Sequence, residues 1–284
     1  MSDLVTGRID PYTPRQMAAR AATLGAAKAQ LDTLSLFTLA VLAGAFIALG
    51  AQLATLVGVA PGFAFGPVRL LVGLAFSLGL VLVVIAGAEL FTGNMLILIA
   101  CLTGAVTTRA LLRNWTIAYA GNFVGAAATA ALVYLARQWA LAGAQVGAAA
   151  LTVAHAKLSL GFVEAVARGI LGNALVCLAV WLCFSARSNV DKIVSIVFPI
   201  TAFVAAGFEH SVANMYLGPV ALLIRNEPSA VLASGLGPEA LARFTWGNFL
   251  VANLIPVTLG NVIGGAVMVA AVYWLVYLRP EAAR

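Results

Sequence analysis

Long charge-free stretches alternate with short charged segments along the chain. These stretches cover residues 33–68, 70–88, 90–108, 114–136, 169–186, 193–208 and 244–278. A helix needs about 20 apolar residues to cross the hydrocarbon core of a bilayer, so most of them are long enough to do so. The first is longer than one span and is interrupted at Pro61, Gly62, Gly66 and Pro67. Because proline and glycine break helices, we expect the first span to end near Val59. The pattern predicts an all-α membrane protein with six transmembrane helices.

Composition agrees with the bilayer as the solvent of this chain. Hydrophobic residues make up 63% of the sequence and charged residues only 9%, which leaves too little polar surface for a soluble globule. Residues 1–32 are charged and contain no long apolar core, so they do not form a cleaved secretory signal. The three cysteines lack the spacing of a metal site, and no basic cluster is interleaved with aromatic residues. We therefore expect no metal and no nucleic-acid partner.

The positions of tryptophan, lysine and arginine predict the orientation. Tryptophan prefers the headgroup layer, and all five fall near proposed span ends, at Trp115, Trp139, Trp181, Trp246 and Trp274. With six spans the termini share a side, and that side holds most of the Lys and Arg. The positive-inside rule then places both termini on the cytoplasmic side of a bacterial inner membrane. The predicted organisation is a cytoplasmic segment over 1–32, one transmembrane pore domain over 33–279 and a cytoplasmic tail over 280–284.

Two segments outside the spans allow more than one interpretation. Residues 140–156 are rich in Ala and Gly, and an outer loop or surface helix fits them better than a further span, which would spoil the charge asymmetry. Thr13, Pro14 and Gln16 match a capping box with proline at the first helical position. We expect an amphipathic helix over 13–31 that lies on the membrane or on a neighbouring subunit. The alternative is a frayed, solvated tail.

Two of the apolar stretches carry similar interruptions. A single helix over 70–108 would be about twice as long as the hydrocarbon core is thick, so it must turn back or break. Gly-x-Glu-x-x-x-x-Asn occurs in its middle, at 87–94, and again at 207–214. The pattern Asn-x6-Gly-Asn-x2-Gly follows each interruption, starting at Asn114 and at Asn253. These matches predict two inverted three-helix repeats whose second and fifth helices are broken. The alternative is a surface hairpin at each interruption.

The interruptions contain polar residues with predicted structural roles. Glu89 and Glu209 occupy equivalent positions, and a carboxylate beside a broken helix can accept hydrogen bonds from the backbone amides that the break frees. Asn94 and Asn214 can pair with freed carbonyls or with polar partners on other helices, and the same logic applies to Asn173. We expect all five to hold the breaks.

His210 distinguishes the second interruption from the first, where Leu90 is its counterpart. An imidazole can donate a hydrogen bond to an anion or lend it a proton near neutral pH. Ionisable residues inside membrane spans are usually functional or paired. The alternative is a core histidine bonded to Thr or Asn.

Three segments resemble the signature segments of the formate/nitrite transporter family, namely residues 87–93, 169–179 and 207–215. The similarity runs from about Pro14 to Arg279. It departs from the family pattern at Gly172, where Ala or Cys is common, and at Ala174, where a bulkier residue is usual. The resemblance implies a channel or transporter rather than an enzyme. It also implies an aquaporin-like protomer with its own pore, a homopentamer and no bound cofactor.

The family's motifs, carried over to this sequence, assign residues to the pathway. Phe76 and Leu80 would line one apolar constriction, and Phe203 would line the other. Thr92 would lie on a mobile loop, facing the histidine across the chamber between the constrictions. Lys157 would attract anions in the outer vestibule. Without the resemblance, the two phenylalanines and the leucine would be read as core residues.

The expected substrate is a small monovalent anion that crosses the apolar gate together with a proton. An anion attracted by Lys157 would take a proton from or through His210 and pass as the neutral acid, since a bare anion is costly to desolvate. Residues 253–279 look closer to formate channels than to nitrite channels, which favours formate; nitrite, hydrosulfide, acetate and lactate are the alternatives. A water or glycerol channel would show paired Asn-Pro-Ala motifs. A membrane-embedded enzyme would need a nucleophile with its base or a metal cluster.

Overall fold

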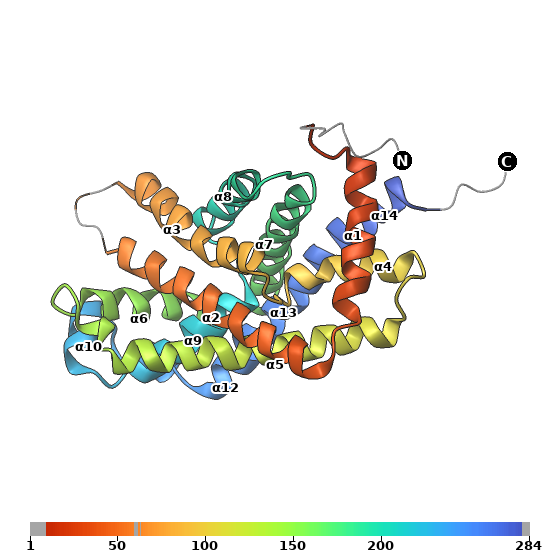
Figure 1. The fold of residues 1–284 in the computed structure, drawn as a ribbon. Coiled ribbons are helices and arrows are strands. Elements are labelled where there is room, and N and C mark those ends of the chain that lie inside the picture. Colours follow the sequence, from red (N-terminus) through yellow and green to blue (C-terminus); the bar gives the residue numbers. More distant parts are fainter. Residues whose placement is uncertain (1–9, 60–61, 63, 280–284) are drawn as a thin grey trace.

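The computed structural model describes residues 10–59, 62 and 64–279, and every regular element within these ranges is a helix (Figure 1). Residues 1–9, Pro61 and the tail predicted at 280–284 lie outside the described residues.

Five helices in the described part of the chain are long and apolar enough to cross a membrane. They are α2 (Thr33–Val57), α3 (Phe65–Ala86), α5 (Thr108–Leu135), α7 (Phe162–Cys183) and a composite helix over Trp246–Tyr277. The composite helix consists of α12 (Trp246–Asn248), η3 (Phe249–Leu254), α13 (Ile255–Val262), η4 (Ile263–Ala271) and α14 (Val272–Tyr277), with π-helical geometry in η3 and η4.

Shorter helices complete the bundle. These are η1 (Gly93–Leu96), α4 (Ile97–Leu102), α8 (Asn189–Ala205) and α9 (Ser211–Ile224). Outside the bundle lie α1 (Pro14–Ala29), η2 (Gln138–Ala140), α6 (Gln145–Leu158), α10 (Pro228–Ser234) and α11 (Pro238–Ala242). The first span ends at Val57, close to its predicted end, whereas α7 begins at Phe162, well before the charge-free stretch at 169. Arg168 therefore lies in the second turn of α7.

Helix α1 stands across the end of the bundle where α4 and α14 lie (Figure 1). The predicted capping box is present, because the side chains of Thr13 and Gln16 bond the backbone reciprocally. Met17 and Gly25 lie on a buried face, and Gly25 packs closely on Ile97 of α4. Residues 14–29 therefore form a helix as expected, and the alternative of a frayed, solvated tail does not hold for them. The buried face of this helix covers the protein's own chain, and contact of its other face with the membrane or a neighbouring subunit stays a prediction.

The opposite end of the bundle carries α6 and α10, which pack on each other (Figure 1). Residues 145–158 form a helix of 14 residues, shorter than the roughly 20 that a span requires. It also packs against α9. The segment predicted as an outer loop or surface helix is thus helical, and it is too short to be a further span.

Glycines let two pairs of helices approach closely. A Cβ atom on Gly125 of α5 would lie 1.9 Å from the carbonyl oxygen of Val41 in α2, and one on Gly264 of the composite helix would lie 2.1 Å from that of Ile170 in α7. No side chain fits at either position. Both glycines belong to the repeated Asn-x6-Gly-Asn-x2-Gly pattern, which thereby marks equivalent helix contacts.

Two helices stop inside the bundle at the predicted interruptions. Helix α3 ends at Ala86, and Gly87 follows with a φ of 80°, in the left-handed region that favours glycine. Helix α8 ends at Ala205, and Gly207 has a φ of 76°. The chain resumes helical structure at Gly93 in η1 and at Ser211 in α9. Each break leaves a short non-helical segment among buried side chains.

Candidate functional site

Two cavities indent the bundle, one near each end. The α6-side vestibule, about 590 Å³ in volume, lies between α2, α3, α6 and α9. The α1-side vestibule, about 280 Å³, lies between α1, α3, α4 and the end of α7. Among the described residues, no residue lines both. The two spaces are therefore distinct cavities.

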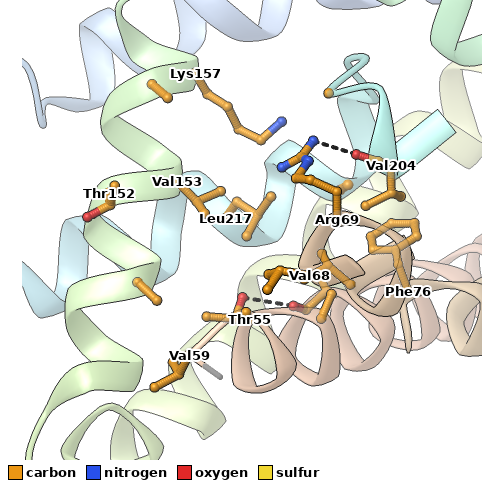
Figure 2. A pocket seen from close by; sticks show the side chains of 18 of the residues that line it. Thr55, Val59, Val68, Arg69, Phe76, Thr152, Val153, Lys157, Val204 and Leu217 are labelled. Atoms are coloured by element: carbon orange, nitrogen blue, oxygen red, sulfur yellow. Dashed lines mark hydrogen bonds between the residues drawn. The ribbon is translucent and has the colours of Figure 1, made fainter. Parts of the chain in front are cut away.

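Both vestibules carry an excess of positive charge. Three basic residues and one acidic residue line the α6-side vestibule: Arg69, Lys157, Arg168 and Glu209. The same numbers line the α1-side vestibule: Arg20, Lys28, Lys192 and Glu89. In Figure 2 the guanidinium of Arg69 and the ammonium of Lys157 point toward the same part of the α6-side space. Such a charge distribution raises the local concentration of anions.

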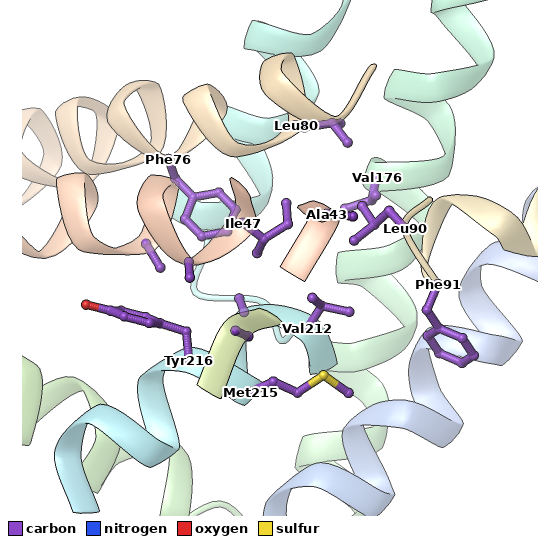
Figure 3. Packing of buried hydrophobic residues seen from close by; sticks show 14 of the residues in the cluster. Ala43, Ile47, Phe76, Leu80, Leu90, Phe91, Val176, Val212, Met215 and Tyr216 are labelled. Atoms are coloured by element: carbon purple, nitrogen blue, oxygen red, sulfur yellow. The ribbon is translucent and has the colours of Figure 1, made fainter. Parts of the chain in front are cut away.

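The layer between the vestibules, here called the septum, consists mainly of Phe76, Leu80, Leu90 and Phe203, all of them buried. The rings of Phe76 and Phe203 meet edge to face, with centroids 5.9 Å apart, and both line the α6-side vestibule. Leu80 and Leu90 line the α1-side vestibule. Figure 3 shows Phe76 and Leu80 at successive depths along α3.

These positions correct the expected constrictions. Phe76 was grouped with Leu80 because the family's motif, carried over to this sequence, places both at one constriction. Phe76 and Leu80 lie at different depths in the bundle. Phe76 instead shares its constriction with Phe203, and Leu80 shares the other with Leu90.

Thr92 and His210 form a direct hydrogen bond inside the septum. Thr92 Oγ1 lies 2.8 Å from His210 Nε2, and both residues are buried, with 0% and 2% of their surface exposed. The His210 ring also lies 5.8 Å from that of Phe203, measured between centroids. The structure therefore brings the two expected pathway residues, Thr92 and His210, into direct contact.

The other ring nitrogen fixes the tautomer of His210. Its Nδ1 accepts a hydrogen bond of 3.0 Å from the backbone N–H of Ala213, at the start of α9. A nitrogen that accepts cannot carry a proton, so a neutral ring holds its proton on Nε2. Nε2 then donates to Thr92 Oγ1, which leaves the threonine hydroxyl hydrogen available to a ligand. The site thus offers neutral donors at a point where the surrounding side chains are apolar.

Each buried glutamate is held by a lysine and an asparagine. Glu209 Oε1 accepts from Lys157 Nζ at 2.7 Å, and Glu209 Oε2 accepts from Asn214 Nδ2 at 2.7 Å. Asn214 also donates to Asn253 Oδ1 at 2.8 Å, and Asn253 in turn donates to the backbone carbonyl of Lys157 at 3.0 Å. Lys157, which the resemblance places in the outer vestibule to attract anions, thus has its ammonium paired with a buried carboxylate.

The same cluster occurs at the first break. Glu89 accepts from Lys28 Nζ at 2.7 Å and from Asn94 Nδ2 at 2.9 Å. Asn94 donates to Asn114 Oδ1, which completes the parallel. The prediction that the glutamates bond freed backbone amides is wrong at both sites, because the carboxylate oxygens accept from lysine and asparagine side chains instead. Lys28, on α1, was missed; only its equivalence to Lys157 in the structure reveals it.

The freed backbone groups are instead bonded by two asparagines that sequence reasoning noted only for their spacing. Asn122 Oδ1 accepts from the N–H of Phe91 at 2.8 Å, and its Nδ2 donates to the carbonyl of Glu89 at 3.0 Å. Asn261 does the same for Ser211 N–H, at 2.8 Å, and for the Glu209 carbonyl, at 3.0 Å. The repeated Gly-Asn pair was the signal that identified them.

Asn173 connects the two breaks. Its Nδ2 donates to the carbonyl of Asn261 at 2.6 Å and to that of Thr92 at 3.3 Å. The Sγ of Cys177, one turn along α7, donates to the Thr92 carbonyl as well. Asn173 thus pairs with one carbonyl at the first break and with one inside α13. In the described residues no cluster of His, Cys, Asp or Glu side chains has the arrangement of a metal site.

Comparison with known proteins agrees with this geometry. The family model described as "Formate/nitrite transporter" matches residues 15–275. "Formate channel FocA" of Escherichia coli K12 is 42% identical over 276 residues, which cover 95% of this chain and 96% of that protein. "Probable formate transporter" of Methanothermobacter thermautotrophicus is 38% identical over 284 residues, covering 94% of this chain and 97% of that protein.

Two solved structures share the fold. One is described as "Pentameric formate channel with formate bound"; it is 43% identical, has a TM-score of 0.81, and the match covers 87% of this chain and 98% of that one. The other, an "FNT family ion channel", is 28% identical with a TM-score of 0.76, over 92% of this chain and 98% of that one. The second and more distant match shows that the similarity in fold extends beyond close relatives.

Proposed function

The chain belongs to the formate/nitrite transporter family, and we propose that it conducts formate through a pore of its own in each protomer. It is a multi-pass membrane protein of a channel and transporter family rather than an enzyme. Formate is preferred to nitrite because the relatives described above are named for formate.

One observation carries the proposal: two basic vestibules are separated by a septum that contains the hydrogen-bonded pair Thr92 and His210, and His210 borders the α6-side vestibule. The basic residues raise the anion concentration at each mouth. Phe76 and Phe203 exclude water from the septum, where a bare anion would be strongly destabilised. A small carboxylate can therefore cross the septum in one of two ways. It can be stabilised by hydrogen-bond donors inside the septum, or it can cross as its neutral acid.

The tautomer of His210 limits how the proton is supplied. A neutral ring that gave up its Nε2 proton would become an imidazolate, which is far too basic to form near neutral pH. We therefore assign the proton to the bulk solution: formate takes it from hydronium in one vestibule, crosses as formic acid and returns it to water in the other. His210 Nε2–H and the Thr92 hydroxyl hold the oxygen atoms by hydrogen bonds. This revises the role expected for His210 from proton donor to hydrogen-bond donor.

The architecture proposed for this function has six spans in two inverted repeats with an aquaporin-like arrangement. Support comes from the breaks after α3 and α8 and from the two equivalent Lys-Glu-Asn clusters. The broken spans would be α3 with η1 and α4, and α8 with α9. A homopentamer in the bacterial inner membrane, with both termini cytoplasmic, follows from the relative described as pentameric and from the Lys and Arg distribution. The α6-side vestibule would then face outward.

Uptake of labelled formate into proteoliposomes tests the function. The wild-type protein should give uptake that rises as the external pH falls, with no swelling in glycerol. His210→Leu places at this position the residue found at Leu90 of the first break. Its formate uptake should fall roughly tenfold or more, because the loss of a hydrogen bond to a charged or strongly polar group has about this effect. His210→Asn retains an N–H donor and should keep much of the uptake with an unchanged pH slope.

The outcomes separate the parts of the proposal. Glycerol permeation without formate uptake would overturn the anion function. Nitrite or hydrosulfide uptake far above that of formate would reassign the substrate within the family. A flat pH profile for an active His210→Asn would show that the imidazole itself supplies the proton.

A further inference from the structure

Arg168 has so far been described only as part of the overall charge of the α6-side vestibule, although it lies inside a membrane-length helix. It occupies the second turn of α7 and lines the α6-side vestibule. An arginine within a membrane span is costly unless it is paired or faces water, and such residues commonly mark ion pathways. Arg69, near the start of α3, lines the same space.

Both arginines bind the end of α8 at its break. Arg69 donates from Nε to the carbonyl of Ala205 at 2.9 Å and from Nη2 to that of Val204 at 2.6 Å. Arg168 Nη1 donates to the carbonyl of Gly207 at 3.3 Å. The last carbonyls of a helix lack partners within the helix and carry the negative end of its dipole. Without the arginines, this negative end would face the mouth of the septum.

The other charges in the vestibule do not supply its positive potential. Lys157 Nζ lies 2.7 Å from Glu209 Oε1, so that pair is close to neutral. Arg168 also contacts Glu164, with Nη2 2.6 Å from Oε1, but these two side chains are 42% and 50% exposed, and such a pair is weak. The two arginines are therefore the source of the positive field.

We propose that Arg69 and Arg168 form a capture site for small two-oxygen anions of the carboxylate type at the mouth of the α6-side vestibule. A guanidinium has five N–H donors in one plane, more than the backbone contacts above occupy, and its geometry matches two carboxylate oxygens. The inference rests on the proposed function for its substrate and deepens it. Arg69 makes two short bonds to the end of α8, whereas Arg168 makes one at 3.3 Å, so Arg168 is the better residue to change.

Thiol modification measures the electrostatic potential in the α6-side vestibule and does not require transport. Val153→Cys places a thiol on α6 in the vestibule lining, where Figure 2 shows Val153 directed inward. The cysteine is modified with an anionic and, separately, with a cationic methanethiosulfonate. The ratio of the two modification rates, anionic to cationic, increases with the local positive charge. Adding Arg168→Gln should lower the anion-to-cation ratio by roughly three- to tenfold. Adding Glu164→Gln should raise the ratio, because it frees Arg168 from its only carboxylate contact described.

Formate influx into right-side-out vesicles at low salt gives the second readout. Arg168→Gln should reduce influx about threefold or more, Glu164→Gln should increase it, and both effects should shrink in high salt. Arg168→Lys keeps the charge but not the planar donors, so it should preserve hydrosulfide influx better than formate influx. Arg243→Gln is the matched control, since Arg243 is exposed and does not line the vestibule.

The two readouts distinguish the failure of each idea. Unchanged modification ratios in Arg168→Gln and Glu164→Gln, with normal formate transport, would overturn the capture site alone. Shifted ratios in a protein that passes no formate would overturn the proposed function and leave the capture site standing. Equal losses in Arg168→Gln and Arg243→Gln would reduce the effect to general surface charge and refute the site.

Discussion

The asparagine at each break provides a prediction whose magnitude follows from the hydrogen bonds. In Asn122→Leu the side chain keeps its approximate volume, but the Phe91 N–H and the Glu89 carbonyl lose the partner that bonds them. Asn122 also donates to the carbonyl of Ala40, which lies inside α2 and keeps its helical partner. Two buried backbone groups are thus left unpaired, each costing about 1–3 kcal/mol. The expected loss of stability is about 2–6 kcal/mol.

Thermal unfolding in detergent measures this loss. Cys177 and Cys183 are 0% and 6% exposed, so a fluorogenic maleimide should label them only as the protein unfolds. At 2–4 °C for each kcal/mol, the midpoint should fall by roughly 5–20 °C. Asn226→Leu, at an exposed position, is the matched control.

The second break supplies an internal check on the same reasoning. Asn261 bonds Ser211 N–H and the Glu209 carbonyl just as Asn122 bonds their counterparts, so Asn261→Leu should lower the midpoint by a similar amount. Midpoints for both variants within about 2 °C of that of Asn226→Leu would refute the view that these amides hold the breaks.

Three further changes test the septum and its scaffold. Thr92→Val keeps the shape but removes the hydroxyl bonded to His210, so formate uptake should fall roughly tenfold; Thr92→Ser should restore it, and full activity in the valine variant would contradict the donor role. Phe203→Ala removes one ring of the edge-to-face pair, so the constriction should widen and the ratio of lactate uptake to formate uptake should rise. An unchanged ratio would contradict the role of this pair as a gate. Gly264→Ala would place a Cβ 2.1 Å from a backbone carbonyl of α7, so unfolding should become easier by about 1–3 kcal/mol in the labelling assay; an unshifted midpoint would show that the two helices can separate without loss.

Features encoded by neighbouring residues were predictable from the sequence. The capping box at Thr13 and Gln16 was found because its partners are three residues apart. The ends of α3 and α8 were predicted from the repeated Gly-x-Glu-x-x-x-x-Asn pattern, whose glycines, Gly87 and Gly207, adopt the left-handed conformation that stops a helix. Local chemistry alone decides such features, so a linear pattern suffices.

Features that depend on distant contacts were not predictable in the same way. Lys28 and Glu89 are 61 residues apart, and nothing near Lys28 indicates a carboxylate partner. Phe76 and Phe203 share a constriction only because α3 and α8 pack side by side. The capping role of Arg168 likewise requires α7 to cross the end of α8. A sequence without aligned relatives contains no direct measure of these contacts.

The two breaks show how a symmetric scaffold can hold an asymmetric site. The lysine, glutamate and three asparagines at each break make the same hydrogen bonds, and none of these bonds uses the side chain at position 90 or 210. That position is therefore free to differ without loss of the scaffold. Leu90 completes the apolar septum on the α1 side, whereas His210 presents its Nε2–H to Thr92 on the α6 side. A second imidazole in place of Leu90 would put a polar ring in the remaining apolar constriction and admit water there. One donor site between two apolar layers is therefore the arrangement that meets an anion without opening a continuous wet path.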